Sequence, residues 1–192
     1  MEERTLVLIK PDGVMRSISG KIISRFEDTG LKIIGMKMIW ADDKLIKNHY
    51  HLDEEWAKNV FEKTKKTREA LGDPFPYKDP IEYGKMIQSW SMNFLKEGPV
   101  IAIVLEGPHA IELVRKIVGP TEPRQALPGT IRGDFASIEP YAVANDKGRG
   151  VRNLIHASDS AGNGKREIDL WFSKNELHSG YNLGHELLLK RK

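Results

Sequence analysis

The chain of 192 residues contains no cysteine. Disulfide bridges and thiolate metal sites are therefore excluded, and any metal centre would need histidine or carboxylate ligands. No apolar run approaches the ~20 residues of a membrane-spanning helix. The first apolar run covers only Leu6 to Ile9, behind an acidic start, which is too short for a secretory signal. These absences predict a cytoplasmic protein with no membrane partner and one core held together by packing.

A strong excess of one charge is also missing. The 30 Lys and Arg residues face 27 Asp and Glu residues, which leaves a net charge of +3. A mixed surface of this kind does not require a nucleic-acid partner, and none is expected. It is equally consistent with a local basic pocket for phosphates. The length and the 40% hydrophobic content favour a single domain over residues 1–192.

The common phosphate-binding loops are absent. A Walker A loop needs a glycine five residues before its Gly-Lys pair, and Gly20-Lys21, Gly84-Lys85 and Gly164-Lys165 all lack it. The Rossmann glycine spacing and the protein-kinase loops are missing too. The histidines show no metalloprotease spacing, so a structural zinc is not expected. Four of them are predicted to be surface residues: His49, His51, His178 and His185.

Apolar periodicity predicts strands over 5–9, 31–40, 100–105 and 151–155, with a turn at Pro11-Asp12-Gly13. It predicts helices over 19–30, 42–50, 109–118 and through 167–172, and a capping box at Ser173 and Glu176 begins a short last helix. This order favours an α+β fold, a ferredoxin-like split βαβ sandwich with a four-stranded antiparallel sheet and helices. Periodicity alone also permits other α+β topologies.

Two segments exceed a minimal domain of this kind. Residues 53–93 form a polar, Lys-rich helical insertion after the second helix region, with a second helix from about Pro80. Residues 137–149 contain proline, glycine and Asn-Asp signals, which predict an irregular loop.

His156 follows an apolar run and precedes a small, acidic turn, Ala157-Ser158-Asp159. One reading is a histidine whose hydrogen bonds are satisfied at a strand end. The other is a nucleophile, since a neutral imidazole, with a reference pKa of ~6.5, can attack phosphorus without a base. Lys10, Arg115 and Arg132 could then neutralise the phosphates, because arginine meets their oxygens two at a time.

The segment Asn153-x-x-His156-Ala157-Ser158-Asp159 resembles the signature of the nucleoside diphosphate kinase family. The chain also resembles that family in Lys10-Pro-Asp-Gly, Tyr50, Arg115 and Thr121, and in the block from Pro128 to Phe135 and Glu167-Ile168. Together these motifs run from Arg4 to about Leu177, and their order makes a chance match improbable.

The resemblance implies that the γ-phosphoryl group of a nucleoside triphosphate passes to His156 and then to a nucleoside diphosphate, in a ping-pong cycle. Mg²⁺ would be carried by the nucleotide phosphates, with no protein ligand. Glu167 and Ser158 would support the imidazole, and nucleotide contacts are implied for Lys10, Tyr50, Arg115, Thr121, Arg132 and Asn153. A homo-oligomer, tetramer or hexamer, is also implied.

Some alternatives stay open. A nucleotide- or nucleic-acid-binding regulatory module on the same fold would keep the scaffold without turnover. Lys10 and Asp12 could merely shape a turn, and Arg115 could extend along its helix to solvent. Asp134 and Asp159 are predicted to tie loops together. The insertion prevents transfer of the family's base-stacking residue, for which the candidates are Phe61, Tyr83, Ile87 and Trp90.

Overall fold

The computed structural model describes residues 2–137 and 139–183, and its strands form one antiparallel sheet. The strands are β1 (Glu2–Ile9), β2 (Lys32–Ile39), β3 (Val100–Pro108) and β4 (Ile155–Ala157), in the order β2-β3-β1-β4. This confirms the predicted ferredoxin-like sandwich. β1 is central and covered on both faces, which explains its continuous apolar run.

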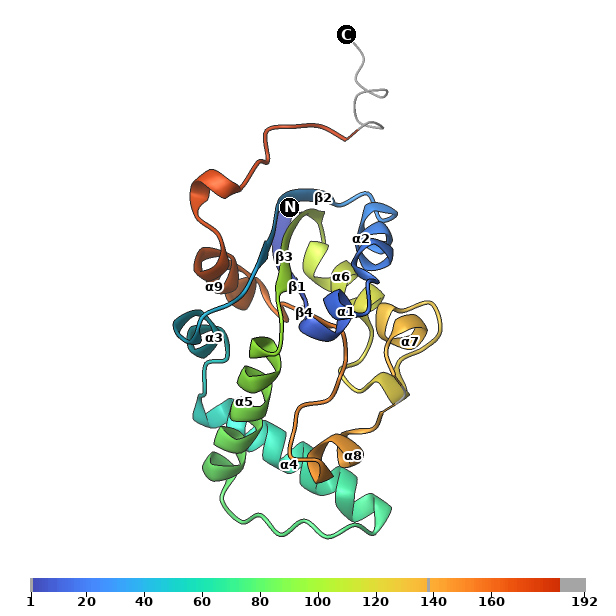
Figure 1. Ribbon diagram of the computed structural model, residues 1–192, viewed down its shortest axis with the longest axis vertical. Coiled ribbons are helices and arrows are strands. Elements are labelled where there is room, and N and C mark those ends of the chain that lie inside the picture. The colour runs from blue at the N-terminus through green and yellow to red at the C-terminus, as the bar shows by residue number, and fades with distance from the viewer. Residues whose placement is uncertain (1, 138, 184–192) are drawn as a thin grey trace.

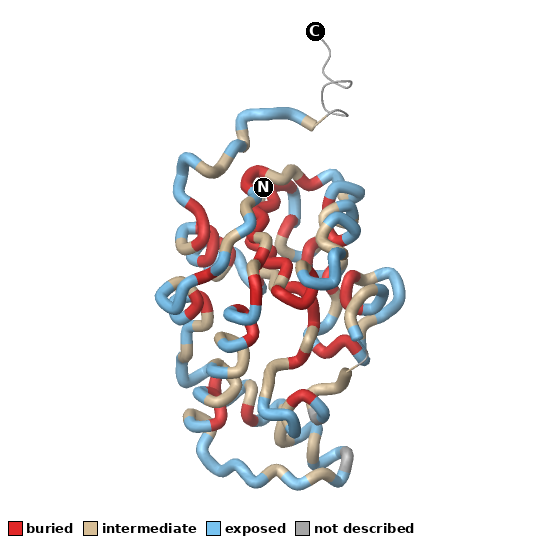
Figure 2. Tube along the Cα trace, in the orientation of Figure 1, coloured by how far each residue is buried: buried red, intermediate tan, exposed pale blue. Residues whose placement is uncertain are grey.

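Each face of the sheet is covered by helices (Figure 1). On one face, α2 (Ser19–Glu27) and α6 (Ala110–Val118) pack Phe26 and Val114 against Val7. On the other, α3 (Asp43–His49), α9 (Ala161–Trp171) and the last turn of α5 (Pro80–Lys96) bury an apolar layer against Leu6. Figure 2 shows buried positions concentrated along the sheet and the inner sides of these helices. The sheet therefore separates two apolar layers.

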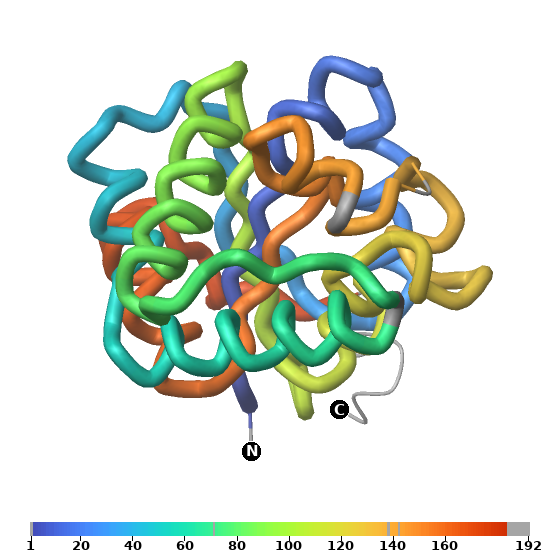
Figure 3. Tube along the Cα trace, turned by 90° about the horizontal axis from the view of Figure 1, so that it is seen from below, coloured from blue at the N-terminus to red at the C-terminus, as the bar shows by residue number. Residues whose placement is uncertain are grey.

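The long excursion is a helical hairpin of α4 (Glu54–Leu71) and α5, as its pattern predicted. Figure 3 shows α4 running beneath the molecule, across the end of the sheet. The second segment differs from its prediction, because α8 (Tyr141–Asp146) forms where an irregular loop was expected. An ion pair of 3.2 Å between Arg68 and Asp146 joins α4 to α8. The contact with α4 supplies tertiary support that local sequence signals do not report.

The segments that follow β1 and precede His156 also differ from their predicted structure. The turn at Pro11-Asp12-Gly13 is the start of a short helix, α1 (Pro11–Met15), whose first position suits proline. Residues 151–154 are not strand, so β4 begins only at Ile155 and His156 lies within it rather than beyond its end. The cause is Leu154, whose φ of 66° is incompatible with an extended strand.

The remaining elements are short. They are η1 (Pro123–Gln125), α7 (Ile131–Phe135) and η2 (Lys174–Glu176). The predicted capping box is present at η2, where Ser173 and Glu176 bond reciprocally. Among the described helices, none has the length and apolar character that crossing a bilayer requires.

Candidate active site

A cavity of about 770 Å³ opens between the sheet end, α4, α5 and α8. Its walls bring together residues that lie far apart in the sequence. Predicted site residues on these walls are Lys10, Tyr50, Arg115, Thr121, Arg132, Asn153, His156 and Glu167. Ser158 does not reach the cavity, since it is fully buried behind Glu167. Its size falls in the range of small-molecule sites.

His156 is held by a carboxylate. Its Nε2 lies 2.9 Å from a Glu167 oxygen, and that same oxygen accepts the Ser158 hydroxyl at 2.7 Å. Burial opposes ionisation of Glu167, but the hydrogen bond and charge of His156 outweigh it and lower the pKa of Glu167. An ionised Glu167 accepts the Nε2 proton, which leaves Nδ1 of a neutral His156 with its lone pair. The arrangement suits a nitrogen nucleophile.

A strained residue precedes this strand. Leu154 is buried and left-handed, a conformation that costs a branched side chain of order 1–3 kcal/mol. Its N–H donates to Asp12 Oδ2 at 3.1 Å, and its carbonyl accepts the Lys10 N–H at 2.8 Å. Asp12 therefore fixes the chain next to the site.

Lys10 projects from the end of β1 into the cavity. Its Nζ donates to Asn153 Oδ1 at 2.8 Å and lies 5.3 Å from the centre of the Phe94 ring. Burial, followed by the nearby Arg132 charge, lowers the pKa of Lys10 to about 8. Asn153 in turn donates to the Thr121 carbonyl at 2.9 Å. These bonds preorganise a cation and an amide at the base of the cavity.

Arg132 is a brace as well as a cation. Its guanidinium donates to the carbonyls of Gly119 (2.8 Å), Asn153 (3.2 Å) and Ile155 (2.6 Å). Burial lowers the pKa of Arg132 to about 10. Within the part of the chain that the structure describes, three of the five N–H groups of Arg132 are thus used, which leaves two for a ligand.

Tyr50 and Arg115 reach the cavity from different helices. Burial, with a further contribution from the Glu167 charge, raises the pKa of Tyr50, so its hydroxyl keeps its proton. Arg115 lies in the last turn of α6 and is exposed along the cavity wall. A neutral hydroxyl and a cation are both suited to phosphate oxygens.

The two acidic residues predicted to tie loops together have such partners. Asp134 accepts the Gly129 N–H at 2.7 Å and pairs with Arg25 at 2.8 Å. Asp159 accepts the Asn163 amide at 2.7 Å.

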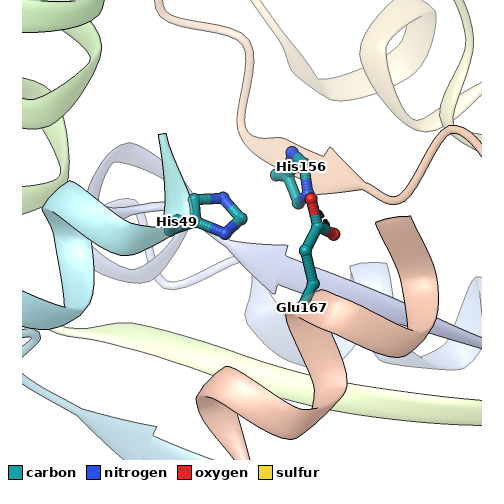
Figure 4. A group of neighbouring side chains, drawn as sticks. All are labelled: His49, His156 and Glu167. Carbon is teal, nitrogen blue, oxygen red and sulfur yellow. Dashed lines mark hydrogen bonds and ion pairs between the residues drawn. The ribbon is translucent and has the colours of Figure 1, made fainter. Parts of the chain in front are cut away.

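The prediction that His49 is a surface residue was wrong. His49 is 4% exposed and accepts the Trp171 indole N–H at its Nδ1, over 3.2 Å. Its ring centre lies 4.5 Å from that of His156, with an interplanar angle of 82° (Figure 4). The signal was present, because His49 follows the buried Ile46 by three residues on α3 and so shares its face. Sequence reasoning missed both His49 and Trp171 as residues that lie around His156.

The other predicted surface histidines divide differently. His51 and His178 are exposed, as predicted. His185 lies outside the described residues.

His49, His156 and Glu167 have donor atoms within 4.8 Å of one another, a spacing that suggests a metal site. The hydrogen bonding argues against one. The lone pair of His49 Nδ1 is taken by Trp171, and a neutral imidazole has only one such lone pair. Glu167 is likewise bonded to Ser158 and His156. Within the trio, His156 is hydrogen-bonded to Glu167, and His49 contacts His156 ring to ring.

The helices α4, α5 and α8 contribute apolar and aromatic side chains to the cavity wall. Trp56 and Val60 from α4, Ile87 and Trp90 from α5, and Tyr141 from α8 line it. Of the stacking candidates, Tyr83, Ile87 and Trp90 lie on the wall. Phe61 does not, because it packs against Phe75 and Tyr83 at centroid distances of 5.0 and 5.9 Å.

Comparisons with known proteins agree with this site. A sequence model described as nucleoside diphosphate kinase matches residues 3–70 and 81–177. A nucleoside diphosphate kinase of Pyrobaculum aerophilum is 45% identical over 179 residues, 91% of this chain and 97% of that protein. Only residues 71–80, between α4 and α5, interrupt the match.

Solved structures give the same result. The NDP kinase crystal structure from Pyrobaculum aerophilum superimposes with a TM-score of 0.88 at 42% identity, covering 93% of this chain and all of that one, 100%. A nucleoside-diphosphate kinase from Borrelia burgdorferi, a transition-state mimic with bound vanadate and ADP, gives 0.79 at 36% identity, covering 97% and 96%. The match covers the sheet, the helices around it and the segments that carry the histidine cluster, and this chain belongs to the nucleoside diphosphate kinase family.

Proposed function

We propose that this protein transfers the γ-phosphoryl group of a nucleoside triphosphate to a nucleoside diphosphate through His156. The Nδ1 lone pair attacks the γ-phosphorus, and the bond to the β–γ bridging oxygen breaks. The electron pair leaves on the nucleoside diphosphate. A terminal phosphate oxygen of a second diphosphate then attacks this phosphorus, and the bond between phosphorus and Nδ1 breaks with its electron pair returning to Nδ1.

The observation that carries this proposal is the bond of 2.9 Å between His156 Nε2 and Glu167. It holds the proton on Nε2 throughout, so Nδ1 needs no base to become nucleophilic. The carboxylate also stabilises the positive charge that the ring acquires when Nδ1 binds phosphorus. Ser158 supports the carboxylate from behind.

The other groups bind the substrate. Lys10, Arg115 and Arg132 would meet the phosphate oxygens, with Tyr50 and Thr121 as hydroxyl partners. Asn153 would reach the sugar side from its position between Lys10 and Thr121. The base would lie against the cavity wall formed by α4 and α5, where Ile87 and Trp90 offer contact surfaces.

Mg²⁺ would arrive on the nucleotide. The buried carboxylates at the site are committed to protein groups, Asp12 to backbone N–H groups and Glu167 to Ser158 and His156. This suits an ion held by phosphate oxygens, where it would offset their charge. Chelation with EDTA should stop turnover, and added Mg²⁺ should restore it.

The test is His156→Gln. The variant should lose both phosphoryl exchange and acid-labile labelling from γ-³²P-ATP, because the amide has no nucleophilic nitrogen. Loss of exchange with normal nucleotide binding would support the assignment. Normal turnover by the variant would overturn it, and absence of labelling in the wild type would favour a regulatory module that binds nucleotides without turnover.

We also propose a homo-oligomer, in which a second copy covers the edge strand β2. Met36 and Met38 in β2 and Trp40 directly after it are 54%, 59% and 66% exposed, at alternate positions of the chain. An exposed, apolar edge strand favours pairing with another chain. The number of subunits, tetramer or hexamer, and a cytoplasmic location stay predictions.

A further inference from the structure

We propose that α9 holds His156 from two directions, directly through Glu167 and indirectly through Trp171 and His49, with His49 as a positioning residue for the nucleophile. The inference rests on the proposed role of His156.

The hydrogen bonding defines the state of His49. An indole N–H can only donate, so the Trp171 bond of 3.2 Å requires an acceptor lone pair on His49 Nδ1. A neutral His49 then carries its proton on Nε2. Burial, and next the neighbouring His156, lower the pKa of His49 well below its usual value, which keeps the ring neutral. One partner thus fixes the orientation, tautomer and charge of His49.

The second ring nitrogen of His49, Nε2, differs from Nδ1. Among the residues that the structure describes, Nε2 of His49 is buried and makes no hydrogen bond. A buried polar group without a partner costs of order 1–3 kcal/mol, so its presence calls for a reason. A phenylalanine of similar size would pack here without that cost. The position therefore uses a property that only the histidine ring offers, namely an acceptor for Trp171.

The contact with His156 supplies the reason. The two rings are perpendicular, with an interplanar angle of 82° and centres 4.5 Å apart, the edge-to-face geometry that aromatic rings prefer. In Figure 4, His49 comes from α3 and His156 from β4, and the two side chains face each other beside Glu167. A perpendicular ring at this distance blocks rotation of the His156 plane.

The bond to Glu167 cannot do this alone. It fixes the position of Nε2, but a single hydrogen bond leaves the ring free to tilt about that point. The His156 side chain is 23% exposed, so the cavity side gives no wall. His49 adds the second restraint, and together the two would keep Nδ1 aimed at the phosphorus.

Both restraints originate on one helix. Glu167 and Trp171 are four residues apart on α9 and therefore share a face. The path runs from His156 to Glu167, along one helical turn to Trp171, and through His49 back to His156. A shift of α9 would move both supports together.

The experiment measures single-turnover phosphorylation of His156 by γ-³²P-ATP with Mg²⁺, without an acceptor, by rapid quench. His49→Phe keeps a ring but loses the acceptor, and Trp171→Phe keeps an aromatic side chain but loses the donor. Each should lower the saturating rate by about 10- to 100-fold, because small misplacements of reacting groups have effects of this size. The nucleotide concentration at half-saturation should change less than twofold. His51→Phe, at an exposed histidine nearby, should leave both values unchanged.

A purely structural role would not give this pattern. The double variant should be no slower than the slower single variant, since both break one path. Saturating rates within twofold of the wild type in folded single variants, or a loss that appears only in half-saturation, would overturn the inference. Wild-type labelling at His156 keeps this failure distinct from failure of the proposed function.

A second measurement needs no variant. Long-range ¹H–¹⁵N NMR of the wild-type protein should show His49 as the neutral, Nε2-protonated tautomer. A proton on His49 Nδ1 would contradict the bond from Trp171 and so the path itself.

Discussion

Single side chains at this site depend on their surroundings for their charge. Lys10 is the clearest case, because burial and the Arg132 charge lower its pKa to about 8, from 10.5 in an exposed lysine. Its amine is therefore protonated below that pH and neutral above it. An exposed lysine keeps its proton at and above this pH, because its pKa is about 10.4.

We predict that nucleotide affinity falls as the pH rises through about 8 in the free enzyme. The protonated amine attracts phosphate oxygens and the neutral amine does not, so binding is strongest below the pKa. Equilibrium titration with a nucleoside diphosphate from pH 6.5 to 9.5 measures the effect. Lys10→Met should bind weakly and lose this pH dependence. A Lys10→Met profile identical in shape to the wild type would place the titration on another group.

Glu167→Gln should reduce turnover by about 10²-fold, as loss of one preorganised electrostatic partner does. The amide oxygen can still accept the Ser158 hydroxyl and the His156 Nε2 proton, but it lacks the negative charge that stabilises a positively charged ring. Steady-state kinetics would show the loss in kcat with little change in KM. Turnover near the wild-type level would show that the carboxylate charge is unimportant.

The secondary-structure elements differ in how far the sequence reveals them. β1 and α6 were predicted because an apolar run and an amphipathic period are local signals. β4 was misplaced because Leu154 adopts its left-handed backbone only through contacts with Asp12 and Lys10. α8 was missed for a similar reason, since the N–H of its first residue, Tyr141, donates to Glu122, 19 residues away, at 3.1 Å.

The residues of the candidate site likewise could be predicted where the signal is local, and could not where it depends on tertiary contacts. Residues within motifs, such as Asn153 and His156, could be found from the sequence and do meet in the structure. His49 and Trp171 could not be assigned to the site, because their roles depend on how α3 packs against α9. The motifs therefore identify the groups on the cavity wall better than the groups behind them.

At the level of elements, we predict that Asp146→Arg breaks the contact between α4 and α8. The new charge would face Arg68, which itself lines the cavity. KM for nucleotides should rise about three- to tenfold, with kcat preserved because His156 lies at the other end. The thermal midpoint should change little, since an ion pair with one partner 71% exposed contributes about 0–1 kcal/mol. Glu27→Arg on α2 is the matched charge reversal and should leave KM unchanged. An unaltered KM in Asp146→Arg would show that the contact between α4 and α8 has no role in nucleotide binding.

At the scale of the whole molecule, β2 is the surface that most needs a partner. We predict that Met38→Lys with Trp40→Glu dissociates the proposed homo-oligomer, because charges would replace apolar groups at a pairing edge. Sedimentation velocity should show a smaller species that still binds nucleotide. An assembly of unchanged size would mean that copies meet through another surface.

The backbone of Leu154 links these scales. Its unfavourable conformation persists only while the Asp12 and Lys10 bonds hold it, and those bonds join segments more than 140 residues apart. If these two bonds break, the backbone of Leu154 can leave its left-handed conformation, and β4 with His156 would then shift. We therefore expect enzymatic activity to fall at a lower temperature than the helical circular-dichroism signal.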